Sequence, residues 1–197
     1  MPPFCEHCGR LLQSNTCPYC QKQPLQIDGM RAVAVFEGNL RRVIHAFKYE
    51  HRPELAPVLA SLMTDYLAAS PMPVDAVIPV PLHPSRERER GYNQSALLAY
   101  ALAQQTQVPV LAQALTRTRV TRSQVELNAQ ARHANVQNAF AADACINGAR
   151  VLLIDDVCTT GATMDACSVA LKHQKAKSVW GLALARPRHP AELDSML

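Results

Sequence analysis

The sequence contains no apolar run near the 18 residues that a membrane-spanning helix requires. Its start also lacks the basic and then apolar segments of a secretory signal, so we expect a cytoplasmic protein with no membrane span. Aromatic residues make up only 5% of the chain, and none of them interleaves with its arginine-rich middle. Stacking platforms for single-stranded nucleic acid are therefore not visible in the sequence.

Lysine is also scarce: the chain has 15 Arg and only 5 Lys, which with 16 Asp and Glu give a net charge of +4. This mild excess suits anionic ligands such as phosphates, and it permits contact with nucleic acid without requiring it. Arginine can bind a phosphate through two parallel hydrogen bonds, which lysine cannot do. With 197 residues, 48% of them hydrophobic, the chain can form one ordinary domain and a small appendage.

Four of the seven cysteines form two pairs near the N-terminus, Cys5 with Cys8 and Cys17 with Cys20. Each pair can place two thiolates on one small turn, and two such turns complete a closed, tetrahedral zinc site. The alternative is a redox-active cysteine pair, but the presence of two pairs with the spacing of a zinc ribbon disfavours it. We therefore predict a zinc-ribbon module over residues 1–26, stabilised by structural Zn²⁺. The other three cysteines lack such spacing and are expected to act as small apolar side chains.

The most informative segment runs from residue 151 to residue 163. The apolar run over residues 151–154 predicts a strand buried on both faces. Two carboxylates, Asp155 and Asp156, come next, followed by a Thr- and Gly-rich turn into a helix. Backbone N–H groups at a helix start favour an anion, whereas adjacent carboxylates suit hydroxyl groups or a divalent cation. The alternative is a capped strand-to-helix turn with two solvated aspartates.

This segment resembles the ribose-phosphate signature of the type I phosphoribosyltransferases, which bind phosphoribosyl pyrophosphate (PRPP). The resemblance implies that Asp155 and Asp156 are the catalytic carboxylates, holding the ribose hydroxyls directly or through Mg²⁺ bound with PRPP. It also implies that the 5-phosphate is held by the loop of Thr159, Thr160, Gly161, Ala162 and Thr163.

Further motifs extend the resemblance over nearly the full length of the chain. The four-cysteine start, the segments at 36–49, 79–86 and 90–94, and a closing Leu-Ala-Arg occur in the order seen in the ComF/GntX family of bacterial competence and DNA-utilisation proteins. The resemblance implies PRPP or a related phosphoribosyl ligand as a partner, with single-stranded DNA or DNA-uptake proteins as further possible partners. No motif identifies the acceptor of a phosphoribosyl group.

The resemblance also assigns a pyrophosphate loop, whose candidate contacts are Pro81, Leu82, His83 and Arg86. Two prolines around this point remove ladder donors, so we expect the chain to leave the sheet in a turn over residues 81–86. The remaining candidates also come from the family motifs. They are Lys48, Tyr49, Arg90, Asn93, Gln94, Arg117, Gln124 and Arg132. The alternative is a solvated helix face for Lys48, a salt-bridged surface for Arg86 and Arg90, and helix capping for Asn93.

The arginine-rich stretch over residues 116–124 alternates basic residues with hydroxyl groups. It is expected to be either an exposed hairpin or the mobile lid that phosphoribosyltransferases close over PRPP. Such a lid excludes water and brings cations to the departing pyrophosphate.

Strand patterns alternate with helical patterns between residues 30 and 186, which predicts an α/β fold. We expect a type I phosphoribosyltransferase-like (Rossmann-like), mostly parallel sheet with helices on both faces, over residues 27–190, and a loose tail over 191–197. The helix at 54–67 should be anchored by Leu55, Val58, Leu59 and Leu62. The ligand should lie beyond the carboxyl ends of the strands, with the zinc ribbon close to that edge.

The cysteine pattern gives a direct prediction. Metal analysis of the purified protein should find about one zinc per chain, since four thiolates complete one tetrahedral site. Substituting Cys8 should unfold the N-terminal module, because some twenty residues cannot build a sufficient core without the metal. An intact fold with no bound metal would contradict the assignment.

Overall fold

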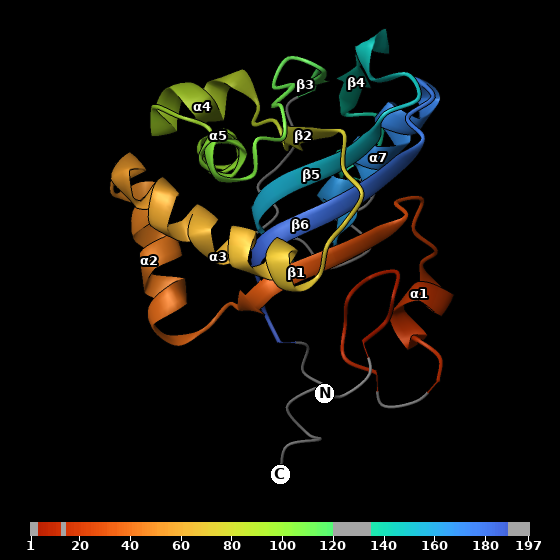
Figure 1. The fold of residues 1–197 in the computed structure, drawn as a ribbon, viewed down its shortest axis with the longest axis horizontal. Helices are drawn as coiled ribbons and strands as arrows, with labels where there is room; N and C mark the ends of the chain where they lie inside the picture. The colour runs from red at the N-terminus through yellow and green to blue at the C-terminus, as the bar shows by residue number, and fades with distance from the viewer. Residues whose placement is uncertain (1–3, 13–14, 120–134, 189–197) are drawn as a thin grey trace.

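The computed structural model describes residues 4–12, 15–119 and 135–188. Its centre is a four-stranded sheet in the order β1-β6-β5-β2, and every neighbouring pair in it is parallel. The strands are β1 (Gly29–Val35), β2 (Ala76–Pro79), β5 (Arg150–Val157) and β6 (Ser178–Arg186). Figure 1 shows these strands side by side in that order. The predicted parallel α/β sheet is therefore confirmed.

Helices cover both faces of this sheet (Figure 1). One apolar core joins the sheet to α2 (Gly38–Tyr49), α3 (Ala56–Ala69) and α5 (Gln94–Thr106), and it receives Leu152 and Ile154 from β5. The other core joins the sheet to α7 (Ala162–His173), and it receives Val151 and Leu153. Because successive residues of a strand point to opposite faces, two buried faces require a continuous apolar run.

The packing of α3 differs from the expected one. A short 3₁₀ helix, η1 (Pro53–Leu55), precedes α3, and the buried face of α3 consists of Ala56, Leu59, Ala60 and Met63. Val58 is 67% exposed and Leu62 is 40% exposed, so their predicted role as anchors is wrong. The helix is apolar on most sides, so either the predicted set of anchors or the observed buried set could face the core, and both sets contain Leu59. The small Ala56 and Ala60 allow close approach to the neighbouring elements, which favours the observed set.

The expected turn over residues 81–86 is shorter than predicted, because helix α4 (Pro84–Arg90) begins within it. The side chain of His83 accepts a hydrogen bond from the Ser85 N–H and caps the helix. Proline is favourable at a first helical position, since it lacks the N–H that would stay unpaired there. Gly91, with φ +80°, ends the helix. Arg86 and Arg90, four residues apart, therefore lie on the same face of α4.

The remaining described elements are small. β3 (Leu115–Arg117) pairs with β4 (Phe140–Ala142) in an antiparallel ribbon, followed by η3 (Ala144–Ile146). Before β3, Val110 forms a single parallel bridge with Val77. Gln124, Arg132 and the tail at 191–197 lie outside the described residues.

The N-terminal cysteine segment lies against β1, at the edge of the sheet (Figure 1). It contains a bridge between Phe4 and Leu11 and the short helix α1 (Pro18–Lys22). The Met30 N–H of β1 donates to the His7 carbonyl at 2.7 Å. In the ranges that the structure describes, no helix combines the length and apolarity needed to cross a bilayer.

The two sets of residues on α3 can be distinguished by mutation. Leu59→Ala should lower the free energy of unfolding by about 2–5 kcal/mol, because it removes buried methyl groups and leaves a cavity. Val58→Ala, one residue earlier in the same helix, should change it by less than about 0.5 kcal/mol, because Val58 is exposed. Urea unfolding of the two variants measures both values. Equal losses would contradict the observed docking of α3.

Candidate functional site

A cavity of about 180 Å³ lies at the carboxyl ends of β2 and β5. The residues that line it come from α2, α4, α5, α7, β3, β5 and the segment after β2, which the fold brings to the same edge of the sheet. Most of the candidate residues from the sequence meet here. The lining consists of Lys48, Tyr49, Val80, Pro81, Leu82, Arg86, Arg90, Gln94, Ser95, Arg117, Asp155, Asp156 and Thr163.

Asp156 forms an ion pair with Lys48, which reaches it from α2. Lys48 Nζ lies 2.9 Å from Asp156 Oδ1, and the two side chains are 19% and 9% exposed. Burial alone would lower the pKa of Lys48, but the charges of Asp156 and Asp155 raise it above its ordinary value. Lysine is therefore held in its charged form, and the negative charge of Asp156 is compensated when no ligand is bound.

Asp155 lies in a different environment from its neighbour. Its Oδ1 accepts a hydrogen bond of 2.9 Å from Ser95 Oγ on α5. Burial, together with the adjacent charge of Asp156, raises the pKa of Asp155 to about 7, against the opposing effect of Lys48. No described residue bonds to Oδ2 of either aspartate. Proteins commonly bind Mg²⁺ through one or two carboxylates, while substrate phosphates supply further ligands. The carboxylate oxygens of Asp155 and Asp156 therefore fit this ion.

Three guanidinium groups also line the cavity. Arg86 and Arg90 come from one face of α4, and Arg117 comes from β3. Arg90 donates to Gln94 Oε1 at 3.0 Å and lies 5.0 Å from the centre of the Tyr49 ring. Burial lowers the pKa of Arg117. Several cations in a partly desolvated space favour a polyanion, since each gains more from an opposite charge than it would in water.

The loop between β5 and α7 has the geometry of an anion cradle. Gly161, with φ +87°, precedes the first residue of α7. This φ is strained for a residue with a side chain, and an added Cβ would also lie 2.4 Å from Met30 Cε, so the position favours glycine. Thr160 Oγ1 accepts from the Ala162 N–H at 3.3 Å. In this part of the described chain, the N–H groups of Thr160 and Gly161 have no protein acceptor, which leaves two donors at a helix start.

The four predicted zinc ligands converge on one point. The Sγ atoms of Cys5, Cys8, Cys17 and Cys20 all lie within 4.8 Å of one another. Cys5 Sγ is 3.8 Å from Cys20 Sγ, and Cys8 Sγ is 3.6 Å from Cys17 Sγ. A tetrahedral Zn²⁺ with Zn–S bonds of about 2.3 Å places its sulfur atoms about 3.8 Å apart, so the cluster fits a structural zinc ion.

Some candidate residues lie beside the cavity and not in its lining. His83 caps α4 with its ring, and Asn93 caps α5 while donating to the Val80 carbonyl at 3.1 Å. Thr159, Thr160 and Gly161 belong to the adjacent cradle. Of the predicted 5-phosphate loop, only Thr163 is among the residues that line the cavity. The capping role of Asn93, one of the two readings offered by the sequence, is confirmed.

Sequence reasoning missed Ser95, Arg10 and Tyr19. Ser95 follows directly after the predicted motif at 90–94, and its position at the start of a helix facing the site was the available signal. Arg10 donates to the Thr159 carbonyl at 3.2 Å, and Tyr19 donates to the Thr160 carbonyl at 2.8 Å. No local pattern identifies contacts between residues about 140 positions apart.

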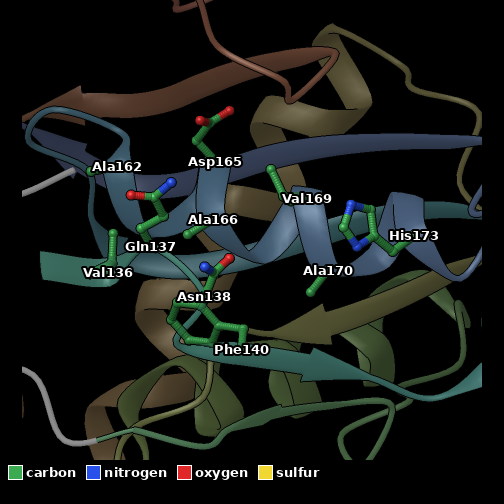
Figure 2. Close-up of a pocket in the computed structure, with 10 residues that line it drawn as sticks. All are labelled: Val136, Gln137, Asn138, Phe140, Ala162, Asp165, Ala166, Val169, Ala170 and His173. Carbon is green, nitrogen blue, oxygen red and sulfur yellow. The ribbon is translucent and has the colours of Figure 1, made fainter. Parts of the chain in front are cut away.

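A larger cavity of about 420 Å³ lies on the outer side of α7 and is lined from Val136 to Phe140 and along the helix. Figure 2 shows Asn138 and Phe140 on one side of this helix and the carboxylate of Asp165 pointing to the other. Asp165 Oδ1 accepts the N–H groups of Gln26 and Ile27, so it connects α7 to the segment before β1. This cavity contains none of the carboxylate, guanidinium and lysine candidates.

Comparisons with known proteins give consistent results. Residues 93–197 match the family model of the phosphoribosyl transferase domain. The chain is 35% identical to competence protein F of Haemophilus influenzae, over 93% of this chain and 85% of that protein. It is 32% identical to the DNA utilization protein YhgH of Escherichia coli K12, over 93% and 84%, and 26% identical to competence protein ComFC of Bacillus subtilis, over 93% and 78%.

Two solved structures are also similar. One is a glutamine PRPP amidotransferase from B. subtilis complexed with ADP and GMP, with 21% identity over 69% of this chain and a TM-score of 0.43. The other is described as the allosteric regulatory enzyme of purine biosynthesis, with 21% identity over 71% of this chain and a TM-score of 0.47. The matched parts span 26% and 30% of those two chains.

The raised pKa of Asp155 predicts a pH-dependent stability. The folded state binds more protons than the unfolded state between about pH 4 and pH 7, so this group lowers the free energy of unfolding as pH rises through that range. Asp155→Asn removes the effect. The free energy of unfolding of the variant, minus that of wild type, should therefore rise by roughly 1–2 kcal/mol from about pH 5 to about pH 8.

Urea unfolding of ligand-free protein at both pH values measures this difference. Asp65→Asn, at an exposed position of α3, controls for the change in net charge. A constant difference between Asp155→Asn and wild type would contradict the assigned environment of Asp155.

Proposed function

This chain belongs to the competence and DNA-utilisation family of competence protein F, YhgH and ComFC, which carries a phosphoribosyltransferase-like domain, and on that premise we propose that it binds PRPP and transfers the phosphoribosyl group to an acceptor. One observation carries the proposal. A pair of carboxylates, an anion cradle and three guanidinium groups lie at one edge of the sheet. PRPP offers a matching set of ribose hydroxyls, a 5-phosphate and a pyrophosphate.

The cradle and the carboxylates would hold the ribose 5-phosphate half of the substrate. The N–H groups of Thr160 and Gly161 would donate to phosphate oxygens, with the dipole of α7 adding to the attraction. Asp155 and Asp156 would accept hydrogen bonds from the ribose hydroxyls. Neither aspartate could contact the 5-phosphate favourably, because a carboxylate repels it. The 5-phosphate would therefore lie at the cradle and the ribose hydroxyls at the aspartates, which would set the orientation of the substrate.

The guanidinium groups of Arg86, Arg90 and Arg117 would hold the pyrophosphate half. Asp155 and Asp156 would hold Mg²⁺ through their carboxylate oxygens, and this ion would supply further charge neutralisation for the leaving group. As the C1–O bond breaks, its electron pair departs with pyrophosphate, and the arginines stabilise the charge that develops there.

The acceptor would form its new bond to C1 from the opposite side and lose a proton to solvent or a nearby base. Positive charge develops on the ribose as the pyrophosphate leaves, and the two carboxylates stabilise it. No covalent intermediate with the protein is required, so the chain needs no nucleophilic residue in the site.

The alternative is a sensor that binds PRPP or a related phosphate metabolite without catalysis, and single-stranded DNA or a partner during DNA uptake. The names of the relatives, which refer to competence and DNA utilisation, favour a link to DNA. Pyrophosphate release over a panel of bases and amines separates the two functions. Tight binding of PRPP, with no pyrophosphate released in the presence of any acceptor tested, would support the sensor.

Calorimetry with PRPP and Mg²⁺ tests the shared first step. Wild type should bind, and Asp156→Asn should weaken binding about tenfold or more, because it removes a charged acceptor and leaves Lys48 without its ion-pair partner. Asp65→Asn on α3 is the matched control and should bind as wild type does. Absence of binding by wild type, or equal affinity after Asp156→Asn, would count against the proposal.

A further inference from the structure

The cysteine module contacts the anion cradle through two side chains. Arg10 Nη2 donates to the Thr159 carbonyl at 3.2 Å, and Tyr19 Oη donates to the Thr160 carbonyl at 2.8 Å. The Arg10 guanidinium lies 3.5 Å from the centre of the Tyr19 ring, and Arg10 is only 8% exposed. The two donors therefore form one stacked unit that bonds consecutive carbonyl groups of the loop.

Peptide geometry gives these bonds a specific consequence. In a planar trans peptide, the C=O of one residue and the N–H of the next point in opposite directions. Fixing the Thr159 carbonyl therefore fixes the Thr160 N–H, and fixing the Thr160 carbonyl fixes the Gly161 N–H. Both N–H groups are turned away from the cysteine module. They are the same two groups that lack an acceptor among the described residues.

We propose that Arg10 and Tyr19 are positioning residues that orient the N–H groups of the cradle, so that the metal-bound cysteine module sets the affinity of the site for the 5-phosphate of its ligand. This inference rests on the proposed binding of PRPP. Neither side chain lines the 180 Å³ cavity, so both act on the ligand through the loop. A donor pair that is already in place lowers the ordering cost of binding.

The metal matters because its ligands flank both positioning residues. Arg10 is two residues after Cys8, and Tyr19 lies between Cys17 and Cys20 on the five-residue helix α1. A helix of that length is not stable alone in water. Four thiolates on one Zn²⁺ would fix both turns and hence both donors, as the sulfur geometry allows.

A second set of contacts ties the same module to the strand ends around the loop. Arg186, the last residue of β6, donates to the carbonyl groups of Cys8 and Cys158 and lies 3.0 Å from Cys158 Sγ. Met30, whose side chain lies beneath Gly161, is bonded through its N–H to the His7 carbonyl. The module therefore supports the loop from the side opposite to the free N–H groups.

The test compares PRPP with pyrophosphate alone, each with Mg²⁺, by calorimetry on the zinc-loaded full chain. Tyr19→Phe keeps the ring under Arg10 and removes one hydroxyl group, and Arg10→Met removes the other donor. Each should weaken PRPP binding about 3- to 10-fold, the value of one hydrogen bond. Pyrophosphate affinity and zinc content should stay unchanged. Tyr100→Phe, half-exposed on α5, is the control and should bind both ligands as wild type does.

Removal of the metal with a chelator should reproduce the pattern of the two variants, with PRPP binding weakened and pyrophosphate binding retained. Wild-type PRPP affinity in both Tyr19→Phe and Arg10→Met would overturn this inference and leave the proposed function intact. A parallel loss of pyrophosphate affinity would also overturn it, since that indicates general damage to the fold. Failure of wild type to bind PRPP would overturn the inference and the proposed function together.

Discussion

Two adjacent carboxylates at the end of a strand that is buried on both faces are the constraint on which the site depends. An ionised carboxylate is costly to bury unless a charge or hydrogen-bond donor compensates it. Lys48 supplies the charge from α2, and Ser95 supplies a hydroxyl from α5. Helices far apart in sequence must therefore dock in one arrangement around Asp155 and Asp156. The same docking brings Arg90 and Gln94 to the cavity.

The anion cradle depends on a different set of contacts, although it follows the same strand. Its backbone conformation requires Gly161, and its carbonyl groups bond to Arg10 and Tyr19. The carboxylates are thus supported by the helices of one face, and the cradle by the N-terminal module. In the proposed binding mode, a change in the module would alter the phosphate end of the ligand and leave the carboxylate end undisturbed.

Local spacing explains what the sequence could predict. The segment at 151–163 and the two cysteine pairs carry their chemistry within a few residues, so the strand, the turn and the cysteine cluster follow from pattern alone. The buried face of α3 does not, because Val58 and Leu59 are both apolar and only docking distinguishes them. Helix α4 was missed because an alternating charge run has no apolar periodicity. Arg10 and Tyr19 act over about 140 residues of sequence, beyond the range of any motif.

The balance of charge in the cavity limits the ligands that it suits. Among the described residues that line the cavity, four are cationic (Lys48, Arg86, Arg90 and Arg117) and two are carboxylates (Asp155 and Asp156), so cations outnumber carboxylates there even when both aspartates are ionised. A neutral ribose derivative would leave this excess uncompensated. A simple nucleoside monophosphate would occupy the cradle but not the arginines. A ligand with phosphate at one end and pyrophosphate at the other satisfies the backbone donors and the guanidinium groups at once, and the distribution of cations therefore supports PRPP over a simple nucleotide.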